Sequence, residues 1–113
     1  MGDVIITNNG GFKEHSYTQA GTLPTAGVNL LTTGLTPIRP TALFRIDFCP
    51  AVDGVLTVTY TIGATATAAK LYGGATLTAT GLYPAEFLVT NAETINFQFS
   101  ATGGAYRLVV REV

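Results

Sequence analysis

The sequence predicts an all-β protein: a single antiparallel β-sandwich, jelly-roll-like, with eight or nine short strands and an irregular N-terminal arm. Three observations support this fold class. Helical periodicity is almost absent, Gly, Pro and Thr punctuate the chain about every eight to twelve residues, and several segments alternate apolar and polar side chains. So many short strands in one domain pack as a sandwich or close as a barrel.

The clearest alternation lies in three segments, Ala42–Cys49, Val55–Ile62 and Thr94–Ala101. Each places its apolar residues on one face, because successive side chains of a strand point to opposite sides. We therefore expect a core that contains the inward residues of these segments and of two further strands, at about 85–90 and 106–113. These residues are Phe44, Ile46, Phe48, Leu56, Val58, Tyr60, Phe87, Val89, Ile95, Phe97, Phe99, Leu108 and Val110.

The remaining strands follow from short apolar runs between turn residues. The Asn8–Gly11 turn, the Asp53-Gly54 turn and the Gly103-Gly104 turn separate some of them, and Gly73-Gly74 is expected to close a tight hairpin. We expect these further strands at about Val4–Thr7, Glu14–Thr18, Val28–Thr32, Thr65–Tyr72, Ala75–Thr80, Ala85–Thr90 and Tyr106–Val113.

A chain of 113 residues suits one domain. Its first forty residues are irregular, because NNGG, AGTLPTAG and TGLTPIRP interrupt every apolar run. We therefore expect an N-terminal arm or edge strands at 1–40 and a β-sandwich at 41–113. Short strands are often lent to a neighbour, so the predicted assembly contacts of this arm are Val4, Ile5, Ile6, Val28, Leu30 and Leu31.

The charge content argues against several classes of partner. Charged residues make up 12% of the chain and the net charge is −1, whereas globular proteins average about 25% charged residues. The six cations are scattered, so no basic patch for nucleic acid is expected. No apolar stretch is long enough to span a membrane as a helix. The start, MGDVIITNNGG, lacks the pattern of a signal peptide, which predicts a protein assembled in a cytoplasm.

No motif in the sequence indicates catalysis, a cofactor or a metal. Cys49 is the only cysteine and is expected to be an inert, buried thiol; His15 is the only histidine and is expected in an exposed loop. Asp47 and Glu86 could face each other as in a small hydrolase, which is kept as a second alternative. Asp47 is instead expected to pair with an arginine on a neighbouring strand, and Asp53 to belong to its turn.

A carbohydrate-binding or adhesin-type module is the first alternative function. Such modules are often small β-sandwiches that present exposed aromatic rings. The chain has no tryptophan, but tyrosine rings also suit a wet interface. The tyrosines that could serve are Tyr17, Tyr72, Tyr83 and Tyr106.

The stretch 55–81 forms a surface that is neither apolar nor charged. Its outward residues include Thr57, Thr59 and Thr61, and its lysine, Lys70, stands near the end of the next strand. Free monomers usually protect such sheets with charge, Lys especially. We therefore expect these threonines to be assembly contacts in a homo-oligomer, with a trimer favoured. The alternative is that threonine satisfies β-propensity on a solvated face.

The carboxyl-terminal part of the chain contains Leu82-Tyr83, the run Glu93-Thr94-Ile95-Asn96-Phe97-Gln98 and the final strand Leu108–Val113. Through these residues, the chain resembles small virion proteins of tailed phages over about residues 41–113. It implies a non-enzymatic β-sandwich that decorates or cements a capsid, often as a trimer. The implied partners are further copies of the chain and a major capsid protein or other virion protein, and the implied location is the virion.

Overall fold

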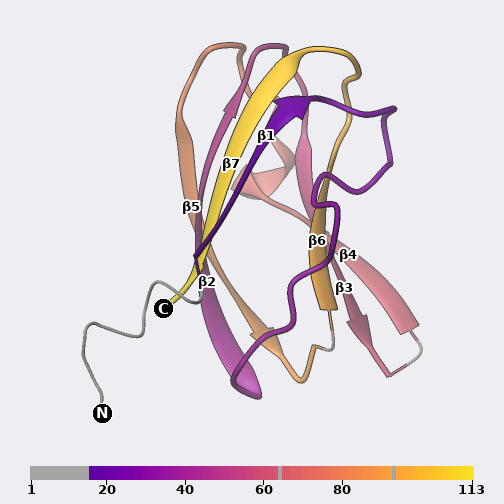
Figure 1. Ribbon diagram of the computed structural model, residues 1–113, viewed down its shortest axis with the longest axis vertical. Helices are drawn as coiled ribbons and strands as arrows, with labels where there is room; N and C mark the ends of the chain where they lie inside the picture. Colours follow the sequence, from indigo (N-terminus) through magenta and orange to yellow (C-terminus); the bar gives the residue numbers. More distant parts are fainter. Residues whose placement is uncertain (1–15, 64, 93) are drawn as a thin grey trace.

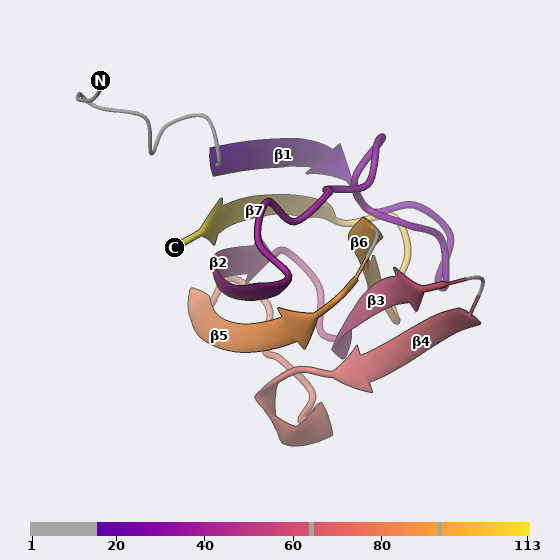
Figure 2. The same ribbon diagram turned by 90° about the horizontal axis from the view of Figure 1, so that it is seen from below.

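The computed structural model describes residues 16–63, 65–92 and 94–113. Within them the chain forms two antiparallel sheets that face each other (Figures 1 and 2). A short 3₁₀ turn at Tyr72–Gly74 follows the fourth strand. The strands are β1 (Ser16–Thr22), β2 (Thr41–Pro50), β3 (Leu56–Ile62), β4 (Thr65–Lys70), β5 (Tyr83–Thr90), β6 (Thr94–Phe99) and β7 (Ala105–Glu112).

The strand order confirms the predicted jelly-roll-like sandwich, with seven strands in the described residues rather than the expected eight or nine. The large sheet has the order β1-β7-β2-β5 and the small sheet the order β4-β3-β6. Two isolated bridges, Asn29–Gln98 and Leu35–Ile95, place the segment 29–35 along the other side of β6. The antiparallel pairs are therefore nested: β1 with β7, 29–35 with β6, β2 with β5, and β3 with β4. This nesting is the connectivity of a jelly roll.

The core lies between the inner faces of the two sheets. All the residues predicted for it are buried except Tyr60 and Phe87, which are half-buried and pack against it. Aromatic rings join the layers: Phe48 of β2 lies 5.2 Å from Phe99 of β6, and Phe87 of β5 lies 6.0 Å from Phe97, measured between ring centroids. Further buried apolar residues, which the pattern did not predict, are Leu23, Leu30, Leu31, Ala42, Leu71, Leu77 and Tyr106.

Residues 16–40 pack as part of the sandwich. β1 is an edge strand of the large sheet and pairs with β7 from Ser16–Arg111 to Thr22–Ala105. After it, Leu23 is buried and its N–H donates to Gly104 O at 2.7 Å. Over these residues the chain forms an edge strand, which is one of the two forms expected for 1–40, and a connection in which Leu23, Leu30 and Leu31 are buried. The remainder, with Val4, Ile5 and Ile6, lies outside the described residues, and the proposed division at residue 40 stays a prediction.

The expected hairpin at Gly73-Gly74 is wrong. Tyr72, Gly73 and Gly74 all have positive φ, at 55°, 66° and 79°, and they turn the chain away from the small sheet. The predicted strand Ala75–Thr80 is a loop in which only Leu77 makes a bridge, to Gly54. In place of a partner strand, a side chain binds the backbone of this loop: the Ala79 N–H donates to Asp53 Oδ1 at 2.7 Å. Asp53, which the sequence assigned to the Asp53-Gly54 turn, thus fixes the 75–80 loop beside that turn.

Candidate functional site

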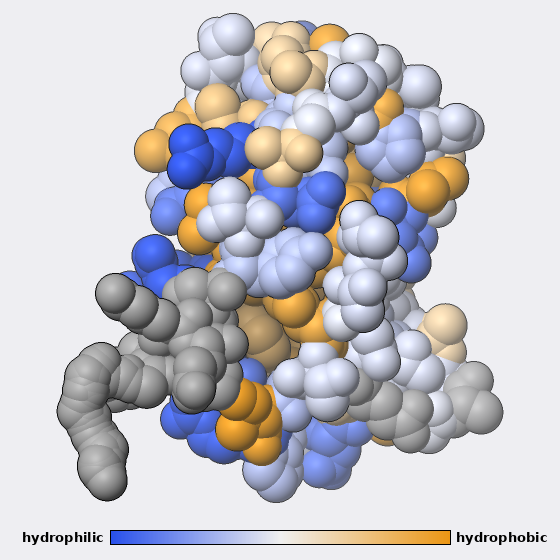
Figure 3. Space-filling view, viewed as in Figure 1, coloured by the Kyte–Doolittle hydropathy of each residue, from blue (hydrophilic) through white to orange (hydrophobic). Residues whose placement is uncertain are grey.

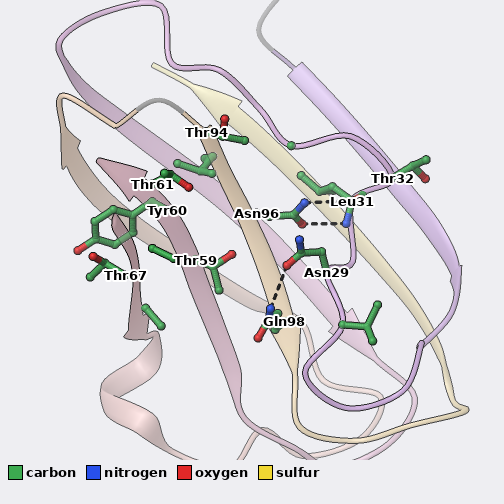
Figure 4. A pocket seen from close by; sticks show the side chains of 15 residues that line it. Asn29, Leu31, Thr32, Thr59, Tyr60, Thr61, Thr67, Thr94, Asn96 and Gln98 are labelled. Carbon is green, nitrogen blue, oxygen red and sulfur yellow. Dashed lines mark hydrogen bonds between the residues drawn. The ribbon is translucent and has the colours of Figure 1, made fainter. Parts of the chain in front are cut away.

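The outer face of the small sheet is hollowed into a groove of about 680 Å³. Threonine, alanine and amide side chains and the ring of Tyr60, all from β3, β4 and β6, line it on one side, and the segment 28–34 lines it on the other (Figure 4). A second hollow of about 530 Å³ continues past Thr57 and Gln98 towards Lys70. The residues lining the first hollow include Val28, Asn29, Leu31, Thr59, Thr61, Ala66, Ala68, Thr94, Asn96 and Gln98.

The register of the strands explains why this face is uncharged. Thr59 of β3 lies between Ala68 of β4 and Asn96 of β6, and the neighbouring row is Ala66, Thr61 and Thr94. Within the described residues, Lys70 is the one charged side chain that lines either hollow. Figure 3 agrees: the side chains over the β3–β4 hairpin, at the lower right, are pale or beige rather than blue.

The threonine hydroxyls of this face are available to a partner. Among the described residues, no hydrogen bond to another group engages the hydroxyl of Thr57, Thr59 or Thr61. Hydroxyls facing solvent can exchange their water contacts for contacts to a partner at little cost. The methyl groups beside these hydroxyls supply a modest apolar area. The face is therefore suited to contact with a protein, although it is not an exposed hydrophobic patch.

Asn96 builds the wall of the groove. Its side chain is buried, and its Oδ1 accepts hydrogen bonds from the N–H of Leu31 at 3.0 Å and of Phe97 at 2.8 Å. Its Nδ2 donates to Leu31 O at 3.2 Å (Figure 4). The amide thus takes the place of a backbone partner where the segment 29–35 bulges away from β6. This is why the expected strand Val28–Thr32 appears only as isolated bridges.

Two further contacts fix the same wall. The Gln98 Nε2 donates to Asn29 Oδ1 at 3.0 Å, at the exposed rim. Gly34 passes so close to Thr94 that a Cβ added at Gly34 would collide with the threonine methyl. A glycine is therefore needed at this position because the chain approaches β6 closely.

The predicted assembly contacts fall into three groups. Thr57, Thr59 and Thr61 lie together along the groove, as expected from their spacing. Val28 is 49% exposed at the rim. Leu30 and Leu31 are buried in the core, which corrects their expected role as free contacts: the segment carrying them closes the open side of β6.

Sequence reasoning missed the amides of this site. Asn96 was expected to face solvent, because it alternates with Ile95 and Phe97. The one available signal is that asparagine is depleted in strands, so its presence inside an apolar strand favours a specific hydrogen-bonding role. That role depends on Leu31, sixty-five residues away, and local pattern cannot reveal it.

The two carboxylates considered for hydrolysis each lie beside an arginine. Asp47 lies 3.9 Å from Arg111, which confirms the expected cross-strand pair, and Glu86 accepts a hydrogen bond from Arg45 Nε at 2.7 Å. Both carboxylates lie on the open outer face of the large sheet rather than in a cleft. Cys49 is half-buried on the same face, less buried than expected. His15 lies outside the described residues, which contain no cluster of metal-ligating side chains.

The tyrosines considered for sugar binding serve internal contacts. The Tyr72 hydroxyl donates to Tyr83 O at 2.6 Å, and the Tyr106 hydroxyl donates to Leu30 O at 3.1 Å. Burial raises the pKa of Tyr72 above its ordinary value of 10.0, and the Asp47 carboxylate raises it further. Burial also raises the pKa of Tyr106. Burial disfavours the charged phenolate and so favours the protonated form of both residues.

The remaining two tyrosines are also engaged. Tyr17 is half-buried against the core, and its hydroxyl donates to Gln19 Oε1 at 3.1 Å. The Tyr83 hydroxyl accepts from Thr78 N at 2.8 Å and lies 3.1 Å from Thr78 O. The four rings therefore do not form the exposed aromatic platform that the carbohydrate alternative requires.

In the described part of the chain, no helix has the length and apolar character to cross a bilayer.

No protein-family model matches the chain, and no curated protein matches it. Solved structures with a similar arrangement include a chain of the T13 particle of infectious bursal disease virus, with a TM-score of 0.45 and 17% identity, and a chain of the Gx strain of that virus, with 0.42 and 21%. Each match covers 84% of this chain and 30% of the viral chain, so this chain spans less than a third of their length.

A Bacillus endospore appendage protein, which forms disulfide-linked pili, matches with a TM-score of 0.40 and 17% identity over 87% of this chain and 84% of its own. TM-scores and identities this low do not decide what the protein does.

Proposed function

We propose that the chain is a non-enzymatic structural protein of a virion, acting as a capsid decoration or cement protein. The observation that carries the proposal is the uncharged groove along β3, β4 and β6, with its unengaged threonine hydroxyls. The chain would attach through this face to the major capsid protein or another virion protein, and to further copies of itself.

Two independent considerations support this proposal. Residues 41–113 resemble small virion proteins of tailed phages. Jelly rolls also recur in viral capsid and lectin domains, although this is an analogy at the level of the fold, which does not by itself assign a function. The described site supplies the physical part: a wide, neutral, mostly open surface is suited to a protein partner rather than to a small substrate, which is usually enclosed by a mostly apolar pocket.

The carbohydrate-binding alternative keeps one observation in its favour. Asn29 and Gln98 place amide groups at the rim of the groove, and amides can bind sugar hydroxyls. Among the described residues that line the groove, Tyr60 is the one aromatic residue. A single half-buried ring is not the platform of several exposed rings that usually accompanies such amides, so the virion function is preferred.

Purified virus particles test the proposal. Particles from a culture that produces this chain would be banded in a density gradient, washed at high salt, and analysed by quantitative mass spectrometry. We expect the chain at a fixed ratio to the major capsid protein, with shells that remain closed when it is stripped. Its absence from washed particles would overturn the proposal, and binding to a glycan array would then favour the alternative.

A further inference from the structure

β4 is the strand of the small sheet that has a neighbour on one side only. It pairs with β3 along its whole length, from Thr57–Lys70 to Ile62–Thr65, and its other edge is free in the described structure (Figure 2). Every residue of β4 is exposed, because the β3–β4 hairpin extends beyond the large sheet (Figure 1). A strand this exposed gains little from the core.

The hydrogen-bond alternation shows which groups of β4 face outward. The Leu71 N–H donates to Leu56 O at 3.1 Å, so Leu71 and Leu56 form a hydrogen-bonded pair. Such pairs alternate along an antiparallel ladder. The backbone groups of Thr67 and Ala69 therefore point to β3, whereas those of Ala66, Ala68 and Lys70 point to the free edge.

Two of the other three edges of the described sheets are protected. The segment 29–35 covers the open side of β6. The edge strand β5 contains Pro84, which lacks an N–H, and Glu86, which is paired with Arg45. Proline and charge are the usual devices against edge-to-edge pairing. β4, with the sequence TATAAK, has neither proline nor acid, and its one charge stands at its end. The third edge, on β1, also lacks proline and charge, but β1 packs Tyr17 against the core, whereas every residue of β4 is exposed.

The position of that charge favours a second copy of β4 as the partner, in antiparallel orientation. If Ala68 lies opposite the partner's Ala68, Lys70 lies opposite the partner's Ala66. The two lysines are then four residues apart along the strand, roughly 13 Å at about 3.3 Å per residue, which exceeds the screening length of about 8 Å at physiological salt. Parallel pairing would instead place the lysines side by side.

We propose that two copies of the chain pair through β4 across a two-fold axis, to form one continuous sheet with the order β6-β3-β4-β4-β3-β6. Ala66, Ala68 and Lys70 of each copy exchange backbone hydrogen bonds with the other, and the small side chains of the strand present no steric obstacle. The two threonine-lined grooves then lie next to each other on one face. The contact is isologous, as two-fold symmetry requires.

This inference deepens the proposed function, on which it rests for its biological setting, because it assigns self-association to one edge. It also departs from the trimer favoured by the sequence. One strand pair buries less than the roughly 800 Å² per partner of a standard interface, so we expect a weak dimer whose population rises with protein concentration.

Sedimentation velocity of the full chain tests the pairing. We expect the sedimentation coefficient of the unmodified protein to rise from monomer to dimer across the micromolar range. Ala68→Lys places like charges opposite each other, and Ala68→Pro removes an outward N–H without breaking the hairpin; both should remain monomeric. The matched control is Thr90→Lys, on the exposed end of β5, which should dimerise like the unmodified protein. Circular dichroism and melting curves check that every variant is folded.

Cysteine cross-linking tests the register. In a Cys49→Ser background, Ala68→Cys places two thiols on the proposed axis, where the Cα atoms of a hydrogen-bonded pair lie about 5.5 Å apart, within disulfide range. Mild oxidation should give a covalent dimer. Thr90→Cys in the same background should stay monomeric.

A monomer at all concentrations, a trimer, or a dimer that survives Ala68→Lys and Ala68→Pro would overturn the inference. These results are separable from the test on particles. If the chain is present on particles and the Ala68 variants bind them normally without dimerising, the function stands without a role for the dimer. If the chain is absent from particles but dimerises through β4, the pairing stands and the virion function fails.

Discussion

The outer faces of the two sheets differ sharply in charge. The large sheet carries Arg45, Arg107 and Arg111 on its outer side, together with the paired acids Asp47 and Glu86. The small sheet carries threonine, alanine and amides, with Lys70 as the one charged residue lining its hollows in the described structure. Charge keeps a sheet face solvated and discourages association. This difference is the basis of our proposal that the small sheet, rather than the large sheet, contacts a partner.

The largest expected effect concerns the inner face of the small sheet, since the groove exists only while that sheet remains packed. Phe97 is fully buried and contacts Phe87 of the large sheet. Phe97→Ala should lower the free energy of unfolding by about 3–5 kcal/mol, a large part of the 5–15 kcal/mol typical of a domain. Leu88→Ala, on the exposed face of the large sheet, should change it little. Urea denaturation measures both, and equal effects would contradict the assignment of the faces.

The next effect concerns the wall of the groove. Asn96→Ala removes the amide that bonds both backbone groups of Leu31, and each buried group left unpaired costs about 1–3 kcal/mol. Gln98→Ala, which removes a bond at the exposed rim, should cost less than about 1 kcal/mol. Chemical denaturation compares the two variants. A smaller loss for Asn96→Ala than for Gln98→Ala would show that the wall does not depend on the buried amide.

The phenols of Tyr72, which is half-buried, and Tyr106, which is buried, also join the two layers. This makes the packing of the layers sensitive to alkali. The raised pKa values of Tyr72 and Tyr106 mean that the folded protein keeps protons that the unfolded chain loses above a pH of about 10. Their contribution to stability is therefore complete below about pH 10 and is lost as the pH rises through the raised values. Melting curves between neutral pH and pH 11 should show this decline, and Tyr72→Phe should reduce it. A melting temperature that rises above pH 10 would refute it.

The smallest expected effect on stability belongs to the outer face itself. Thr59→Lys in the groove and Thr18→Lys on β1 both add a charge to a sheet surface, and each should change the free energy of unfolding by about 0.5 kcal/mol or less. They should differ in association: Thr59→Lys should weaken binding to particles, whereas Thr18→Lys should not. Binding measured by co-sedimentation with stripped particles distinguishes them, and equal binding would remove the functional distinction between the faces.

The sequence predicts those features that depend on local alternation. The inward residues of β2, β3 and β6, the uncharged threonine row and a cross-strand arginine partner for Asp47 all follow from period two and strand composition, although the choice of Arg111 does not. Features that depend on distant contacts do not follow. Glu112 can be buried because its carboxylate accepts hydrogen bonds from the N–H groups of Ile38 and Arg39. No local pattern indicates that the segment with Ile38 and Arg39 lies beside the end of β7.

The same limit explains the candidate site. The threonines were recognisable, whereas the groove was not, because its second wall comes from the segment 29–35, whose apolar runs are too short and irregular to indicate a strand. The glycine pair Gly73-Gly74 is typical of a hairpin. Because Tyr72, Gly73 and Gly74 all have positive φ, the chain leaves the small sheet there and continues as a loop. The free edge of β4 follows only once the order of the sheet is known.

Hydrogen exchange resolved at single amides tests most directly whether association uses the small sheet. The account predicts that exchange of the Ala66, Ala68 and Lys70 amides slows as the concentration of the full chain rises. The outward amides of β5 should exchange at a constant rate, because that edge is protected by Pro84 and the Arg45–Glu86 pair. Slowing confined to β5, or exchange at β4 that is independent of concentration while the protein self-associates, would contradict the account.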